Sequence, residues 1–184
     1  MKKLATVAAL AILTASSVSA EGFYVGAGIS QERLLPIGAP FSVKSTNAIA
    51  LIGYDINDMI SVEAETSLPV SKHNITASEI TADVSVYHTA VFAKFTLPTS
   101  GSFKPFARAG MTKGTFKAEN MSVGSSVGPS VIKVNDTVFS YGIGAEWAMS
   151  EKFGLRVDYS MMEMSNDVSP GDVEVIALSS VYRF

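Results

Sequence analysis

The chain has no cysteine and few charged residues. Of its 184 residues, two are histidine, 17% are charged and 47% are hydrophobic. Without cysteine there are no disulfides, thiolate metal sites or cysteine nucleophiles, and two histidines leave little for an imidazole metal site. A net charge of −3 excludes a strongly basic nucleic-acid-binding protein, and the apolar content excludes a disordered chain. We therefore predict no metal, no cofactor and no nucleic-acid partner.

Long hydrophobic runs are also missing, except near the start of the chain. Residues 1–20 combine Lys2 and Lys3, an apolar stretch over 4–14 and a small-residue end at Val18-Ser19-Ala20. This order predicts an export signal peptide cleaved after Ala20. The apolar stretch is too short for a transmembrane helix, which needs about 20 residues. We expect a signal peptide over 1–20 and one mature domain over 21–184.

The mature chain alternates between large apolar residues and small or polar ones. The clearest case runs from 137 to 147, where Phe139, Tyr141, Ile143, Ala145 and Trp147 share one face. A period of two is typical of a β-strand, because successive side chains point to opposite faces. The same alternation recurs over residues 23–30, 47–54, 60–66, 87–95, 106–112, 153–162 and 175–184. These segments predict eight strands, each near the length that crosses a bilayer at a tilt.

The breaks between these segments alternate in length. Three are short, at 55–58, 97–103 and 149–152, and four are longer, at 31–44, 68–83, 116–136 and 163–171. Short turns at one end and long loops at the other are typical of outer-membrane barrels, whereas the connections of a β-sandwich would not sort in this way. We predict an all-β fold: an eight-stranded antiparallel up-and-down transmembrane β-barrel.

Charged residues gather on the face opposite the large apolar side chains. They are Glu63, Glu65, Lys94, Arg108, Glu146, Arg156, Asp158 and Arg183. An eight-stranded barrel has an interior just wide enough for side chains, and buried charges must be paired. Four acids balance four bases here, so we predict a charge network inside the barrel. A soluble lipocalin-like barrel would instead place Phe139, Tyr141 and Trp147 inside and leave Gly142 and Gly144 outside.

Aromatic residues of the apolar parity lie near the ends of the predicted strands. We assign six of them to the membrane interface: Phe23, Tyr54, Phe95, Trp147, Phe153 and Tyr182. Aromatic side chains favour membrane interfaces, where Tyr and Trp can also form hydrogen bonds. The alternative is the ordinary preference of aromatic residues for strands.

Three segments carry a resemblance to a known family. The end of the chain, Ser180-Val181-Tyr182-Arg183-Phe184, resembles the signal that the outer-membrane assembly machinery recognises, with Tyr182 and Phe184 as its aromatic positions. Residues 139–162 resemble strands six and seven of the OmpA-type transmembrane domain, and residues 22–28 resemble first strands of the porin-like outer-membrane β-barrel family. The resemblance implies a Gram-negative outer membrane and contact with its lipids, including lipopolysaccharide. The chain ends at the last strand, so we expect no periplasmic peptidoglycan-binding domain.

The resemblance specifies architecture more closely than function. We expect a monomeric, non-catalytic protein with a structural or surface-interaction role, and a host or envelope ligand at loops 32–44, 68–83 and 116–136. The first loop is apolar over 34–41. It either contacts a host molecule, a partner protein or the lipid surface, or it packs on its neighbours or lies at the membrane rim. The third, serine- and glycine-rich over 121–134, is either mobile or a hairpin that extends its flanking strands.

Two other functions stay open. The first alternative is a small porin-like channel for small solutes, with the inner charges lining a pore. The second is a lipid-modifying outer-membrane enzyme, which would need a histidine near a serine and oriented by an acid. His88 has the inner parity and Glu65 is expected nearby, but no His-x-Ser motif is present. We therefore assign no catalytic residue.

Overall fold

The protein is described from a computed structural model, which covers residues 22–36, 43–70, 73–77, 80–123, 126–127, 132–166 and 169–184. The signal peptide predicted over 1–20 lies outside these residues. The strands are β1 (Phe23–Pro36), β2 (Val43–Asp55), β3 (Ile60–Pro69), β4 (His73–Ala77), β5 (Ile80–Thr96), β6 (Phe103–Val123), β7 (Ser126–Val127), β8 (Ile132–Ala148), β9 (Phe153–Asn166) and β10 (Ser169–Arg183). In these ranges no helix is long and apolar enough to cross a membrane.

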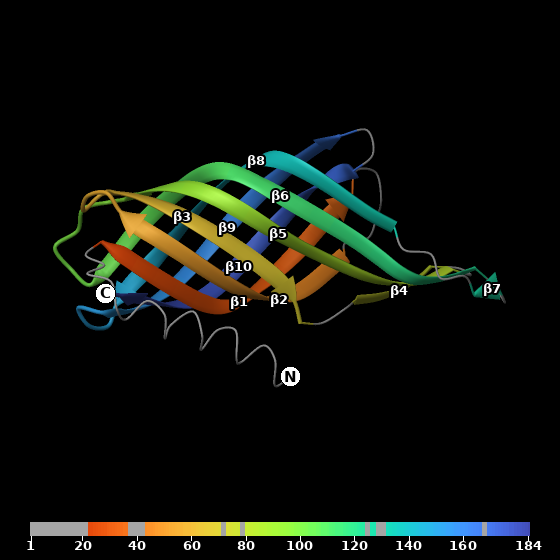
Figure 1. Ribbon diagram of the computed structural model, residues 1–184, viewed down its shortest axis with the longest axis horizontal. Helices are drawn as coiled ribbons and strands as arrows, with labels where there is room; N and C mark the ends of the chain where they lie inside the picture. The colour runs from red at the N-terminus through yellow and green to blue at the C-terminus, as the bar shows by residue number, and fades with distance from the viewer. Residues whose placement is uncertain are drawn as a thin grey trace.

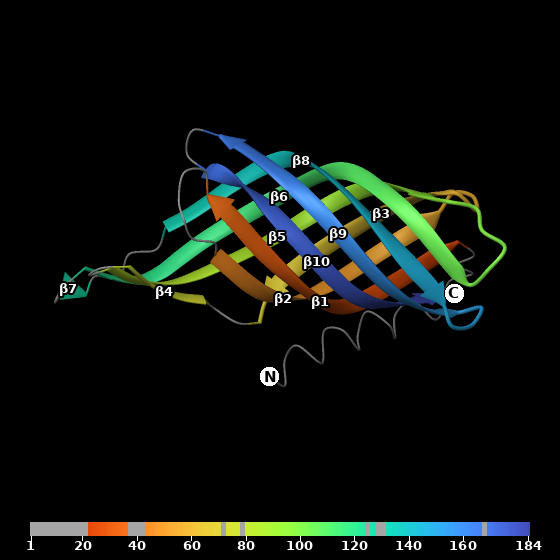
Figure 2. The same cartoon turned by 180° about the vertical axis from the view of Figure 1, so that it is seen from behind.

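Eight of the strands form a closed antiparallel barrel. The order is β5-β3-β2-β1-β10-β9-β8-β6, and pairing between β5 and β6 closes the ring. The first and last strands pair along almost their whole length, from Tyr24 opposite Arg183 to Pro36 opposite Gly171. Figures 1 and 2 show the tilted strands from opposite sides. The predicted fold class is confirmed.

The predicted long loops are wrong in their extent, because much of each is strand. β5 and β6 pair from Thr96 opposite Phe106 as far as Ile80 opposite Val123. Beyond the end of β3, β4 takes its place as the partner of β5. β7 pairs with the outer end of β6. Figure 1 shows β4 and β7 at the far end of the extended ribbon. Of the two interpretations of the third loop, the hairpin extension is confirmed for 116–123 and 132–136. The apolar outward pattern that marks these strands stops at the membrane edge, so each predicted strand is too short at its outer end.

The side-chain parity follows the predicted faces over the membrane-spanning part. Outward residues such as Ile29, Ile143 and Ile176 are more than half exposed, whereas inward residues are buried in alternation with them, as along β3. An exposed apolar belt around a polar interior is the arrangement expected of a barrel in lipid.

Beyond the belt the polarity inverts. Outward apolar positions give way to charge within one alternation, from Met111 to Lys113 on β6 and from Ile176 to Glu174 on β10. At the same end the interior becomes apolar: Val86, Val138, Met162, Val173 and Val175 are buried together, with Leu34 and Phe116 packed against them. Polar outside and apolar inside is the pattern of a barrel in water. The reversal of faces predicted for the whole barrel therefore holds only for its membrane-spanning part.

Candidate functional site

The lumen is the candidate site, and Glu63 on β3 lies at its centre. Its side chain is fully buried and contacts three strands at once. Arg156 Nη1 and Nη2 donate to its two carboxylate oxygens at 2.6 and 3.1 Å. The Tyr24 hydroxyl donates at 2.6 Å, and Lys94 Nζ lies 3.0 Å from Oε1. This carboxylate therefore joins β1, β5 and β9 across the barrel.

A second group of charges lies beside this centre. Arg108 on β6 contacts Glu65 at 2.8 Å and Asp158 at 2.9 Å. Arg156 also donates to Asp158 at 3.1 Å, so the two guanidinium groups share this carboxylate. The guanidinium groups stack on buried rings, Arg108 on Phe92 and Arg156 on Phe106, at 4.3 and 4.4 Å from the ring centres. Ion pairing and cation–π contacts together replace the water that these charges lose on burial.

The third group was only partly anticipated from the sequence. His88 on β5 lies between two carboxylates, with Nδ1 2.9 Å from Glu32 and Nε2 3.0 Å from Glu65. The expected proximity of His88 and Glu65 is confirmed. Ser67 donates to Glu32 at 2.7 Å and accepts the His88 backbone N–H at 2.8 Å. When both carboxylates are ionised they can only accept hydrogen bonds, so both ring nitrogens must then donate and His88 is an imidazolium cation.

Adding Glu32 and His88 changes the charge count of the lumen. Five carboxylates now oppose five cations, the acids being Glu32, Glu63, Glu65, Glu146 and Asp158 and the cations His88, Lys94, Arg108, Arg156 and Arg183. Sequence reasoning missed Glu32, because it ended the first strand at Ser30. Continuing the inward parity of Tyr24, Gly26, Gly28 and Ser30 by one step would have found it.

The last two predicted charges lie at the short-turn end of the lumen. Arg183 donates to both oxygens of Glu146. Its Nε atom also lies 3.6 Å from an Asp55 carboxylate oxygen, and the side chains of Arg183 and Asp55 are both partly exposed. The structure thus brings all eight predicted interior charges into contact with oppositely charged partners. Six of them form one chain of ion pairs that ends at His88, and Glu146 and Arg183 form a separate pair at this rim.

Tyr24 links this rim to the centre, and glycine makes room for it. The Tyr24 ring lies over Gly53 on β2, where an added Cβ would be 2.1 Å from the ring atom Cζ. Lys94 donates to the Tyr24 hydroxyl at 2.8 Å and lies 4.5 Å from the ring centre. The ring therefore needs a residue without a side chain beneath it, which explains a glycine within a strand.

Side chains replace backbone pairing at one seam of the wall. The ladder between β3 and β5 ends at Thr66 opposite Thr89, and β5 pairs with β4 only from Val84 onward. In between, Asn47 donates to the Val86 carbonyl at 2.7 Å, and Ser67 accepts from the His88 N–H. The His88 group therefore closes the wall as well as filling the lumen.

The predicted interface aromatics lie on the outer surface. Phe23, Tyr54, Phe95, Trp147 and Phe153 are each more than 40% exposed, and Phe23 packs on Tyr54 at 4.8 Å between ring centres. Tyr182 packs on Phe153 and Phe184, at 5.3 and 5.2 Å. These residues belong to the short-turn ends of their strands, as the Trp147–Phe103 and Tyr182–Phe153 pairings show.

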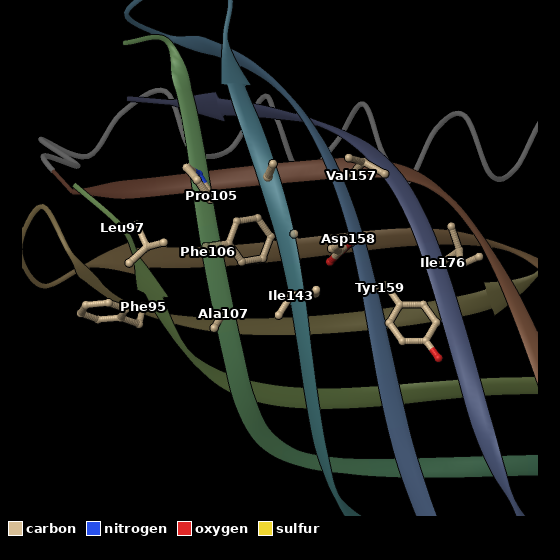
Figure 3. Close-up of a pocket in the computed structure, with 12 residues that line it drawn as sticks. Phe95, Leu97, Pro105, Phe106, Ala107, Ile143, Val157, Asp158, Tyr159 and Ile176 are labelled. Carbon is tan, nitrogen blue, oxygen red and sulfur yellow. The ribbon is translucent and has the colours of Figure 1, made fainter. Parts of the chain in front are cut away.

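A hollow of about 620 Å³ lies along the wall from β5 to β10 (Figure 3). Most of its lining has the lipid-facing parity, with Ala107 and Ala145 between larger side chains such as Phe95 and Tyr159. Its one charged lining residue, Asp158, is held by Arg108 and Arg156. The hollow therefore offers hydrocarbon contacts but no reactive group. Within the described ranges, no group of three or more histidine and acidic side chains has a geometry that could hold a metal ion.

Comparison with known proteins gives a family match over almost the whole chain. A model described as "Outer membrane protein beta-barrel domain" matches residues 4–184. No curated protein matches the chain in sequence.

Solved structures with the same arrangement of strands come from several bacteria. Neisserial surface protein A has a TM-score of 0.68 at 17% identity, covering 89% of this chain and 98% of its own. Ail, the attachment invasion locus protein of Yersinia pestis, has 0.65 at 18%, with coverage of 89% and 99%; it has also been solved with the heparin analogue sucrose octasulfate. The N-terminal β-barrel domain of Pseudomonas aeruginosa OprF has 0.58 at 13%, with coverage of 89% and 98%. At these identities the likeness shows the fold alone.

Proposed function

Because the chain belongs to the family of outer membrane protein β-barrel domains, we propose that it is a non-conducting, non-catalytic barrel that presents extended strands for surface interactions. Membership places it in the outer membrane of a Gram-negative bacterium. The observation that carries the proposal is the combination of a filled lumen with strands much longer than the membrane needs.

The strand lengths support the surface role. β6 has 21 residues and β5 and β8 have 17 each, whereas about 9–11 residues cross the bilayer. At about 3.3 Å per residue, β6 is roughly 70 Å long. Short turns lie on the periplasmic side in such barrels, so the excess length projects outward from the cell. A ligand outside the cell would meet this part first.

The filled lumen argues against the channel alternative. Along the axis, the ion pairs around Glu63 and Arg108 are followed by the His88 group and then by the apolar cluster of Val86, Val138 and Val173. A solute would have to separate paired buried charges and then cross a dry apolar layer. Both steps are costly, so we expect no stable conductance.

The surroundings of His88 argue against the enzyme alternative. Ser67, His88 and Glu65 lie in the order of a hydrolytic triad, with Ser67 Oγ 3.1 Å from Nδ1 and Glu65 3.0 Å from Nε2. A general base needs a free lone pair on the ring, but both nitrogens lie within 3.0 Å of a carboxylate oxygen here. Ser67 and His88 are also 0% and 2% exposed, which leaves no room for a lipid substrate. The test compares the acyl chains of lipid A in cells with and without the expressed protein, and we expect no difference. A change in the acyl chains that the His88→Ala variant no longer produces would contradict the proposal.

The names of two structural neighbours, Neisserial surface protein A and the attachment invasion locus protein, are consistent with a surface role. We further propose that the chain is monomeric, contacts lipopolysaccharide, is exported by a signal peptide cleaved after Ala20, and is recognised by the assembly machinery through Tyr182 and Phe184. N-terminal sequencing of the mature protein tests the cleavage site, with Glu21 expected first.

The surface role is tested with a variant that keeps the barrel and loses the extension. Tight turns replace residues 71–83 and 117–134, and wild type, variant and deletion strains are compared for adhesion to host cells and for envelope permeability. We expect the variant to lose adhesion while it keeps heat-modifiable migration in detergent gels, the sign of a closed barrel. If the deletion strain adheres like wild type but loses uptake of small solutes, the channel alternative replaces our proposal.

A further inference from the structure

The hollow in the apolar belt is a groove that crosses five strands (Figure 3). We call it the belt groove. One side of it is a row of outward residues that lie opposite one another in successive ladders: Phe95, Ala107, Ile143, Tyr159 and Ile176. Four strand spacings of about 4.8 Å make this row roughly 19 Å long. One leaflet is about half of a hydrocarbon core of about 30 Å, so the groove is long enough for a chain that crosses one leaflet.

Small residues give the belt groove its depth. Ala107 and Ala145 are diagonal neighbours on β6 and β8. Gly144 has no side chain, so the buried Phe106 and Asp158 border the groove from the lumen side. An added Cβ at Gly144 would lie 2.4 Å from Phe106 Cζ and 2.6 Å from Asp158 Cβ. A hydrocarbon chain in the groove would contact the protein on several sides, and dispersion attraction grows with the number of such contacts.

The short-turn end of the belt groove has a single positive charge. Leu97 donates its backbone N–H to the Pro105 carbonyl at 2.8 Å, and the two residues line this end. Between 97 and 105 the only charged residue is Lys104, which is exposed and forms no ion pair with any described residue. A lysine side chain can extend to the membrane surface and bind phosphate as a point charge.

The opposite end of the belt groove is acidic. The Tyr159 hydroxyl donates to Glu174 at 3.1 Å, and just beyond it Glu163 on β9 lies opposite Asp172 on β10. Arg33 lies 3.6 Å from Glu174, so it compensates one of these three carboxylates. A lipid phosphate would therefore be attracted to the short-turn end of the groove and repelled from this one.

A second copy of the chain fits the belt groove poorly. Two barrels are both convex, so they touch along a narrow strip, whereas a stable interface buries about 800 Å² on each partner. Ile143 and Phe95, which are 66% and 44% exposed, would also hold a second barrel away from Ala107 and Ala145. A thin, flexible chain can enter between these side chains, and the hydrocarbon of the bilayer consists of such chains.

From these observations we infer that the belt groove binds one acyl chain of a glycerophospholipid from the inner leaflet, with the phosphate of that lipid at Lys104. A lipid of the outer leaflet, such as lipid A, would have to place its phosphates at the acidic end. The inference rests on the orientation in the proposed function, with the short turns in the periplasm, but it does not require adhesion. The bound chain would cover the wall where Gly144 lacks a side chain.

The test measures by native mass spectrometry which lipids the purified full chain retains in a neutral detergent. The protein is loaded with phosphatidylglycerol, with diacylglycerol of the same acyl chains, or with lipid A. We expect one retained phosphatidylglycerol per barrel and weaker retention of the other two. Ala107→Leu with Ala145→Leu fills the groove and should lower retention at least about fivefold, as the loss of about ten carbon–carbon contacts would give. Lys104→Gln should also lower it about fivefold.

The control adds the same volume to the lipid face away from the groove. Ala50→Leu with Ala64→Leu alters two exposed diagonal neighbours on β2 and β3, and this variant should retain the lipid like wild type. Ala145→Val fills less of the groove and should give an intermediate result. Heat-modifiable migration confirms that each variant is folded.

Several outcomes would overturn the inference. They are no retained phospholipid, equal retention by the filled and control variants, equal retention of diacylglycerol, and a preference for lipid A. A complex of two chains that the filled variant abolishes would also overturn it, in favour of a second copy in the groove. The variants are assayed for adhesion as well, and the filled variant should adhere like wild type. Failure of the surface role therefore leaves groove-dependent lipid retention intact, and the reverse.

Discussion

Replacing Glu63 by glutamine should destabilise the barrel more than any surface substitution. The carboxylate accepts from Arg156 at 2.6 and 3.1 Å and from Tyr24 at 2.6 Å, and Lys94 lies 3.0 Å away. The amide keeps one acceptor oxygen, but its NH₂ group would face another donor. Lys94 and Arg156 would also stay buried with one negative charge too few. Breaking a buried ion pair in this way costs about 3–5 kcal/mol.

The single tryptophan of the chain provides the assay. Trp147 is 56% exposed on the outer belt, so its fluorescence should report its transfer from an apolar to an aqueous environment when the barrel unfolds in urea. The control is Glu151→Gln, at an exposed position in the turn between β8 and β9, and its midpoint should equal that of wild type.

A double variant distinguishes charge balance from packing. Glu63→Gln with Lys94→Met removes one charge of each sign, so it should be less destabilised than the sum of the two single variants, by at least about 1 kcal/mol. A loss below about 1 kcal/mol for Glu63→Gln, or strict additivity in the double variant, would refute the account of the lumen as a mutually dependent ion-pair network.

Three further changes test other parts of the structure. Gly53→Ala should displace the Tyr24 ring from the barrel wall and cost about 1–3 kcal/mol of stability in the same unfolding assay. Gly101→Ala should have no effect, because the nearest atom to its added Cβ would be 4.0 Å away. Equal unfolding midpoints for the two variants would contradict this account. His88→Ala should leave Glu32 and Glu65 without their shared cation and cost about 3–5 kcal/mol; wild-type stability would show that the two carboxylates do not depend on the imidazolium. Ile143→Arg, on the lipid face, should cost about 2–4 kcal/mol in folding into lipid vesicles, while Thr137→Arg above the belt should cost little; similar losses for both would show that the belt ends elsewhere.

The sequence was sufficient for the barrel and for the faces of its membrane-spanning part. Alternation in segments such as 139–147 determines which side chains meet lipid, because a shift of one residue would expose the other set. The parity also places the eight interior charges on one face. Their partners could not be read from the sequence, since pairing across the lumen depends on the stagger between strands that are distant in the chain, such as β3 and β9.

Three features required the structure for a clear physical reason. Glu32 and the apolar cluster around Val173 lie where the barrel leaves the membrane, and there the outward face no longer needs to be apolar. The pattern that identifies a membrane strand therefore ends before the strand does. The role of Gly53 was hidden because a glycine reveals nothing about the ring that covers it.

The central claim is that paired charges and an apolar layer fill the lumen of an outer-membrane barrel. Single-channel recording of the purified wild-type protein in a planar bilayer tests this most directly, with its folded state confirmed by heat-modifiable migration. We predict a quiet baseline without stable steps. Large, reproducible conductance steps from the folded protein would contradict the account.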